Sequence, residues 1–126
     1  MMNENEIAKL IVNACYHIHV ELGPGLLESV YEEVLSFELL KLGLSIQRQK
    51  GLPVIWKTLK MNLGFRADLI VENKVIIEIK SIETVAPVHA KQLLTYLRIT
   101  GLKLGLLVNF NAPLIKNGIT RVVNNL

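Results

Sequence analysis

Apolar residues in the first 42 positions recur every three or four residues, which is the period of an α-helix with one buried face. In the stretch 4–22 these positions are Ile7, Leu10, Ile11, Ala14, Cys15 and Ile18. Gly23-Pro24-Gly25 interrupts the pattern, because proline lacks an amide donor and glycine tolerates positive φ. A second periodic stretch covers 26–42, before Gly43. We therefore predict two helices.

From position 45 the pattern changes to short runs rich in β-branched and aromatic residues, as is typical of strands. We predict strands, mostly joined by hairpins, at 46–49, 52–56, 65–71 and 75–80. Pro87 can open a third helix, which we expect to end near Gly101. Beyond it, a buried strand is predicted at 103–108 and a short last strand at 119–123.

The predicted order is helix, helix, strands, helix, strand. Because a strand that follows a crossover helix can lie parallel to a neighbour, we expect a mixed sheet with helices packed against it. This order predicts an α/β or α+β three-layer sandwich. A chain of 126 residues fits a single domain over 1–126.

The composition serves mainly to exclude other classes of protein. With 51% hydrophobic residues and four prolines, the chain is not of the disordered class. Its apolar runs are far shorter than the roughly 20 residues that cross a bilayer, so we expect no membrane partner. The acidic N-terminus does not resemble a secretory signal, and a single cysteine suits a reducing compartment, so we expect a cytoplasmic location.

The net charge of +3 favours an anionic partner such as nucleic acid, although a solvated basic surface explains it equally well. The basic residues are scattered, apart from a local set of Arg48, Lys50, Lys57 and Lys60. Trp56 precedes Lys57, a pair that suits base stacking with a phosphate contact, while packing in a core or within a hairpin is the simpler alternative for a lone tryptophan.

Three charged residues stand out on the apolar strands. Alternation puts Glu78 and Lys80 on one face of their strand. If the intervening turn is centred on Asn73, Asp68 lies directly opposite Glu78 on the neighbouring strand. Two carboxylates so placed repel one another unless a cation lies between them. The alternative is a cross-strand salt-bridge set on an exposed face, which contributes only about 0–1 kcal/mol.

Two carboxylates without a cysteine cluster favour a hard cation, Mg²⁺ or Mn²⁺. A metal, two acids and a lysine are the groups that hydrolysis of a phosphodiester needs, because the metal activates water and stabilises charge on phosphorus. Lys80 is expected to position the water or stabilise the transition state.

The pattern Asp68, then Glu78-Ile79-Lys80, resembles the motif of the PD-(D/E)xK nuclease superfamily, with Ala67 in place of the usual proline. Gln92 and Tyr96 look like the Q-x-x-x-Y element of its exonuclease branch and share a helix face. The resemblance implies a restriction-endonuclease-like fold, a metal-dependent nuclease, and a role for Gln92 in orienting the site or its substrate.

A more specific match is Gly25, Glu28 and Tyr31, which read G-x-x-E-x-x-Y and resemble the GxxExxY family of this superfamily. The resemblance covers 7–123. It implies that Glu28 completes a metal site with Asp68 and Glu78, and that the Ile79 carbonyl is a further ligand. Tyr31 is then expected to hydrogen-bond a carboxylate or a phosphate.

Several of these residues also have a purely structural explanation. Glu28 suits a solvated position near a helix N-terminus, and Tyr31 and Tyr96 suit burial with the hydroxyl at the rim. Arg66 shares a face with Asp68 and is expected to hold a carboxylate or touch phosphate. His89 is expected to cap or pack its helix. A further set does not converge on a metal, because residues two apart on a helix diverge: Cys15, His17 and His19.

The sequence thus predicts a nuclease that uses Mg²⁺ or Mn²⁺ and acts on nucleic acid, with DNA favoured over RNA. The alternative is a nucleic-acid-binding or assembly module that keeps the fold without useful catalysis. A chain this small has little surface to encircle a duplex, so a homodimer is expected to hold substrate across two subunits.

Overall fold

The computed structural model describes the backbone of residues 1–126 and the side chains of residues 1–62 and 64–126. Its helices are α1 (Glu4–Leu22), α2 (Glu28–Lys41) and α3 (Pro87–Thr100), with a 3₁₀ turn η1 (Ile115–Asn117). Its strands are β1 (Ile46–Trp56), β2 (Leu59–Val71), β3 (Val75–Lys80), β4 (Leu104–Asn109) and β5 (Ile119–Val123).

The five strands form one mixed sheet in the order β1-β2-β3-β4-β5. Every neighbouring pair is antiparallel except β3 and β4, which are parallel and are joined by the crossover helix α3. The buried strand β4 therefore lies inside the sheet, between β3 and β5. This confirms the predicted mixed sheet.

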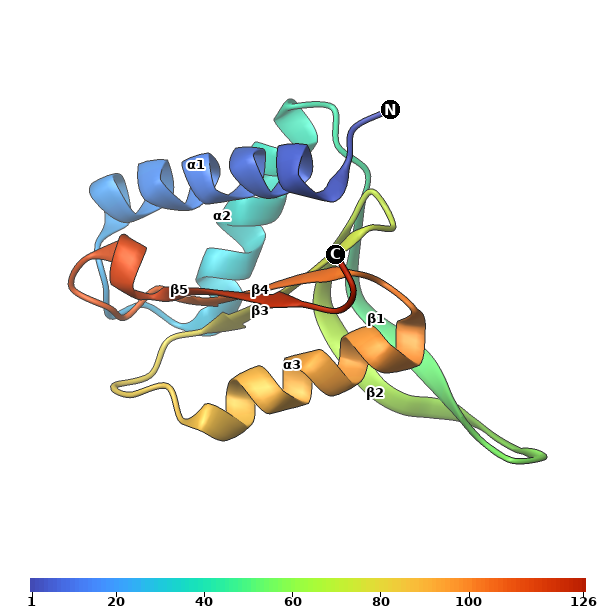
Figure 1. Cartoon of the computed structure of the whole chain (residues 1–126). Helices are drawn as coiled ribbons and strands as arrows, with labels where there is room; N and C mark the ends of the chain where they lie inside the picture. The colour runs from blue at the N-terminus through green and yellow to red at the C-terminus, as the bar shows by residue number, and fades with distance from the viewer.

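The sheet separates two hydrophobic layers, as Figure 1 shows, with α1 and α2 on one face and α3 on the other. Alternate residues of β3 divide between them, because Ile77 and Ile79 pack toward α1 and α2 while Ile76 packs toward α3. The predicted three-layer sandwich is confirmed. None of the described helices is long and apolar enough to cross a membrane.

The helices form where the periodic patterns predict them. Asn3 caps α1 by accepting a hydrogen bond from the Glu6 amide, and the Glu6 carboxylate accepts one from the Asn3 amide in return. Gly101 ends α3 with a φ of 76°, a conformation that glycine adopts without strain. The second helix is shorter than predicted, because 26–27 belong to the loop before α2.

The first two predicted strands are wrong as separate elements, since β1 runs without a break from Ile46 to Trp56. Pairing with β2 continues through the predicted break, where Lys50 lies opposite Ala67 and Gly51 opposite Arg66. Tertiary pairing thus outweighs the weak strand propensity of glycine. β1 is an edge strand, which is where a sheet tolerates a residue such as Pro53 that has no amide to donate.

The β2–β3 and β1–β2 pairings have different lengths. β2 pairs with β3 only from Val71 to Leu69, whereas it pairs with β1 as far as the Trp56↔Leu59 pair at the turn. β1 and β2 therefore continue beyond the sheet as a two-stranded ribbon that projects from the body of the molecule (Figure 1).

Candidate active site

The candidate site lies where β2 separates from β3. The last pair between these strands is Leu69↔Ile77, and this register sets Asp68 opposite Glu78, as predicted from a turn centred on Asn73. The Asp68 carboxylate accepts a hydrogen bond of 2.8 Å from the Ile79 amide. The Asp68 side chain is thus the acceptor for an amide of β3 at the point where the two strands separate. This hydrogen bond fixes the position of Asp68 there.

Glu78 projects on the α3 side of the sheet and is largely buried. Its Oε1 atom is buried and has no hydrogen-bond partner among the described residues. Burial and the charge of Asp68 raise the pKa of the Glu78 carboxyl to about 9, although the positive charge of Lys80 partly opposes this. A buried carboxylate oxygen without a donor, beside a second acid, is a position where a cation or a bound proton would relieve the repulsion.

Helix α2 supplies a third acid through its first turn. The Glu28 carboxylate accepts a hydrogen bond of 3.1 Å from the amide of Ser81, the residue that follows β3, and the Ser81 hydroxyl donates to the Leu26 carbonyl at 2.6 Å. These bonds tie the N-terminus of α2 to the end of β3. Glu28 thereby comes to line one pocket of about 430 Å³ together with Ser29, Glu32, Gln49, Asp68 and Ile79.

The three acids do not meet at a single point. Within the described side chains, no group of three or more His, Cys, Asp or Glu residues is placed to hold a metal ion. Asp68 and Glu78 lie close together, and Glu28 shares the pocket with Asp68 rather than with Glu78. Side chains of the described residues thus provide a pair of neighbouring acids and one acid further along the same pocket.

Two polar residues that the sequence reading missed connect α2 to Asp68. The Gln49 amide donates to Glu32 at 2.6 Å and to Asp68 at 3.1 Å. Glu32 is 8% exposed and also accepts from Arg48 at 3.1 Å. Gln49 lies opposite Asp68 in the β1–β2 register and has a φ of 48°, which is unusual for a residue with a side chain. Glu32 is one helical turn beyond Glu28, so the spacing of the two acids in the sequence could have indicated that they share a helix face.

Tyr31 is buried and its hydroxyl bonds to backbone groups, whereas the G-x-x-E-x-x-Y resemblance implied a bond to a carboxylate or a phosphate. Its side chain is fully buried and stacks on Phe110 at 4.4 Å between ring centroids. Its hydroxyl donates to the Gly23 carbonyl at 2.6 Å and accepts from the Leu26 amide at 3.1 Å. Tyr31 therefore fixes the loop before α2, in which Gly25 has a φ of 99°, and so helps place Glu28.

Helix α3 covers the other side of the two acids. Tyr96 stacks on Phe65 of β2 with ring centroids 4.0 Å apart. Burial raises the pKa of the Tyr96 hydroxyl, and the charges of Glu78 and Asp68 raise it further, while a hydrogen bond with Gln92 lowers it. Tyr96 is thus close enough to both acids for their charges to affect its pKa. Gln92 lies one turn earlier on the helix and is exposed.

The remaining candidates lie outside this group. Arg66 is exposed on the ribbon opposite Gly51, and no ion pair joins it to a described acid. His89 accepts a hydrogen bond of 3.1 Å from the Ala86 amide and so caps α3, as expected. Cys15 is buried, which raises the pKa of its thiol to about 12 and makes it a poor nucleophile and metal ligand.

Comparison with known protein families agrees with this geometry. A model of the PD-(D/E)XK nuclease superfamily matches residues 5–122, which is most of the chain. The mixed sheet with helices on both faces is consistent with a restriction-endonuclease-like fold. No curated protein and no solved structure matched the chain at a significant level.

Proposed function

The chain belongs to the PD-(D/E)XK nuclease superfamily, and on this basis we propose that it hydrolyses phosphodiester bonds of DNA with Mg²⁺ or Mn²⁺ bound between Asp68 and Glu78. Members of the superfamily are typically nucleases and usually use divalent metal ions such as Mg²⁺. The proposal therefore goes beyond the family in two respects, the choice of DNA as substrate and the binding of Mg²⁺ or Mn²⁺ between these two acids.

The observation that carries this proposal is the buried Oε1 atom of Glu78, which has no hydrogen-bond donor although it lies beside Asp68. A hard divalent cation prefers carboxylate oxygens and removes the repulsion between two neighbouring acids. The residues therefore fit such an ion. We assign Asp68 and Glu78 as its ligands and the Ile79 carbonyl as a further one. Glu28, the other ligand that the resemblance implies, lies further along the pocket and is not placed to share an ion with Glu78 in this structure.

The bound ion would supply a water of lowered pKa and a positive charge near phosphorus. Lys80 holds the attacking water or the developing negative charge, and its amine lies on the same strand face as Glu78. Gln92 orients the site from α3. Tyr96 and Arg66 contact the substrate, Tyr96 from beside the acids and Arg66 from the exposed ribbon.

We assign the chain to the GxxExxY family within the superfamily, because the motif has a structural purpose here. Tyr31 and Gly25 shape the loop that delivers Glu28 to the pocket. We also propose a homodimer that holds substrate across two subunits. Sedimentation velocity at micromolar concentration tests the dimer, and a monomer at all concentrations would refute it.

The decisive experiment is cleavage of single-stranded, duplex and branched DNA and RNA in Mg²⁺, in Mn²⁺ and in EDTA. Asp68→Asn and Glu78→Gln are suitable variants, because each keeps the shape of the side chain and removes its charge. Each is expected to lower the rate at least about 100-fold. Glu83→Gln is the matched control, since Glu83 is an exposed acid in the loop after β3.

Equal cleavage by both variants and by the control would refute the site. A second measurement separates folding from chemistry: Mn²⁺ is expected to raise the melting temperature of the wild-type protein and not that of the two variants. Salt-dependent binding of nucleic acid without cleavage in either metal would instead favour a nucleic-acid-binding or assembly module.

A further inference from the structure

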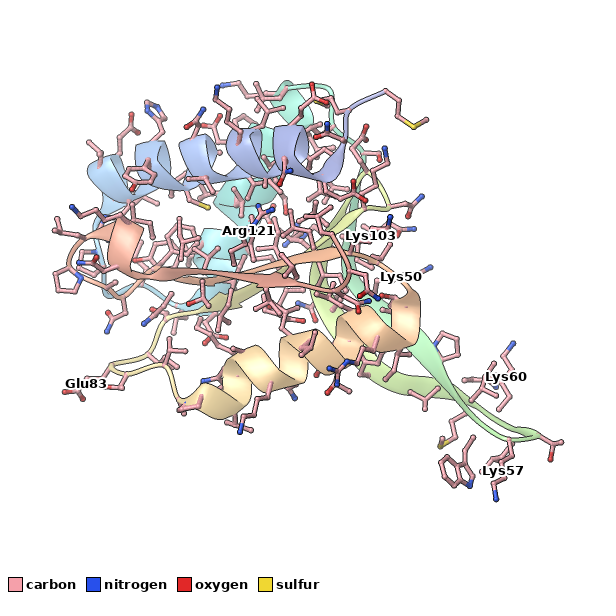
Figure 2. All side chains as sticks on the ribbon, in the orientation of Figure 1. Lys50, Lys57, Lys60, Glu83, Lys103 and Arg121 are labelled. Carbon is pink, nitrogen blue, oxygen red and sulfur yellow. The ribbon has the colours of Figure 1, made fainter. Side chains whose placement is uncertain are left out.

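Among the described side chains, the ribbon beyond Asp68 packs against the α3 layer only at its base, through Ala67, Leu52 and Phe65. β1 and β2 pair only with each other there, and they turn at Lys57 and Thr58, with Lys57 at a φ of 56°. Figure 2 shows Lys57 and Lys60 at the free end, away from all three helices. This part of the chain therefore contributes little to either hydrophobic core.

The charge of the chain is concentrated in this ribbon. Residues 46–67 contain five basic residues and no Asp or Glu, whereas the whole chain has a net charge of +3. The remainder of the chain therefore has a net charge of −2. The positive charge that suggested an anionic partner thus belongs to the β1–β2 hairpin, of which the ribbon is the projecting part.

Most of these basic groups are free to bind an anion. Arg48, at the base of β1, pairs with Glu32 at 3.1 Å and with Glu33 at 2.8 Å. The other four basic residues of the segment form no ion pair with any described side chain: Lys50, Lys57, Lys60 and Arg66. Their positive charges are therefore not neutralised within the molecule.

The tip of the ribbon also exposes apolar side chains. Trp56 and Ile55 are each 65% exposed and Leu59 is 57% exposed. The Lys57 ammonium lies 5.4 Å from the centre of the Trp56 ring. The tryptophan is thus not packed in a core, and its contact within the hairpin leaves most of the side chain exposed. An exposed aromatic face beside lysines suits a base next to phosphates.

We propose that the β1–β2 ribbon is a nucleic-acid-binding arm, in which Lys57 and Lys60 contact phosphates and Trp56 packs on a base at a frayed or unpaired position of the substrate. We choose a nucleic acid as the ligand because the tip of the ribbon combines an exposed aromatic ring with lysines that form no ion pair with a described side chain. The inference rests on the proposed nuclease function for the identity of its substrate.

The length of the arm sets a distance along the substrate. Nine residues of β2 lie between Asp68 and Thr58, and a strand rises about 3.3 Å per residue, so the tip lies roughly 30 Å from the site. A duplex rises about 3.4 Å per base pair, so this distance spans about nine base pairs. The arm contacts substrate almost one helical turn from the acids.

The test is binding of a fluorescent duplex with an unpaired end, followed by anisotropy over a range of salt concentrations in EDTA, where no cleavage occurs. In the double variant Lys57→Gln and Lys60→Gln, the slope of log K against log salt is expected to fall by about 1.8, because each lysine releases about 0.9 counterion. Lys9→Gln with Lys116→Gln is the matched control, since both lysines are exposed and lie on α1 and η1. An equal slope for the two double variants would refute the arm.

Trp56 is tested separately on the same substrate. Trp56→Ala is expected to weaken binding about 5- to 150-fold, and Trp56→Phe is expected to restore most of the affinity. On duplexes shorter than about 9 base pairs, the lysine double variant and its control should have the same slope of log K against log salt. If Trp56→Ala abolishes self-association and leaves nucleic-acid binding unchanged, the tip is a contact between copies of this chain and the inference is wrong.

The outcomes distinguish the arm from the nuclease function. Metal-dependent cleavage that is lost in Asp68→Asn, together with unchanged binding in the arm variants, would refute the arm alone. Absence of cleavage together with the expected loss of binding in the arm variants would refute the nuclease and leave the arm in place.

Discussion

Replacing Glu78 with glutamine should stabilise the folded protein while it abolishes catalysis. The wild-type carboxyl is buried beside Asp68 with one oxygen unpaired, so the folded state disfavours its charge. A glutamine of nearly the same shape has no charge to bury. The substitution therefore removes an unfavourable term from the folded state, in contrast to most changes at buried positions.

The magnitude depends on pH. Burial and Asp68 raise the pKa of Glu78 from 4.5 to about 9 in the folded protein. Because the folded state retains a proton that the unfolded state has lost, the wild-type protein is most stable below pH 4.5 and loses stability as pH rises toward 9. Each pH unit in this window is worth about 1.4 kcal/mol. Glu78→Gln should thus exceed the wild type by on the order of 3 kcal/mol at pH 7.

Urea unfolding in EDTA at pH 5, 7 and 8.5, followed by far-UV circular dichroism, measures this difference. The free-energy gap between Glu78→Gln and wild type is expected to grow with pH, and saturating Mg²⁺ is expected to narrow it by stabilising the wild type alone. Glu83→Gln should show no such trend. A gap that stays constant across the three pH values, or a variant less stable than wild type at pH 8.5, would refute the reasoning.

Three further changes test other parts of the structure. Tyr31→Phe removes the hydroxyl that fixes the loop before α2 and should lower the free energy of unfolding by about 1–3 kcal/mol in urea titrations; an unchanged midpoint would contradict this. Gly64→Ala puts a Cβ 2.7 Å from Val54 Cβ and should destabilise the ribbon, which proteolysis of the hairpin detects as faster cleavage than in wild type; equal rates would contradict it. Glu32→Ala should destabilise the fold by about 1–3 kcal/mol in chemical denaturation, whereas the exposed Glu33→Ala should stay within about 1 kcal/mol, and equal losses would contradict the assignment.

The local pattern was sufficient to predict much of the fold. The periodicity that predicts α1 and the strand at 119–123 depends on which side chains face a core, and both elements have the predicted bounds. The register of β2 on β3 was also predictable, because a turn centred on Asn73 leaves only one residue for Asp68 to face. These features depend on neighbours close in sequence.

The parts that were missed depend on contacts distant in sequence. Gln49 reaches Asp68 only because β1 pairs with β2, and Glu32 reaches Gln49 only because α2 packs beneath that edge of the sheet. The side chain of Tyr31 faces inward for a similar reason, since Phe110, the residue after β4, stacks on its ring. The spacing of residues along a helix shows which of them share a face. Only the packed structure shows which residues of other elements that face contacts.

The separation of β2 from β3 at Asp68 gives this scaffold an adjustable length. Residues beyond that point pair only within the ribbon, so adding two residues to each strand would leave every pair of β2 with β3 unchanged. An even insertion also preserves which side chains face which side. Each such step would lengthen the ribbon by about 6.6 Å, or roughly two base pairs. If the ribbon is the arm proposed above, such an insertion would change the length of substrate that the protein contacts while its acids stay in place, and it offers a route to engineering that length.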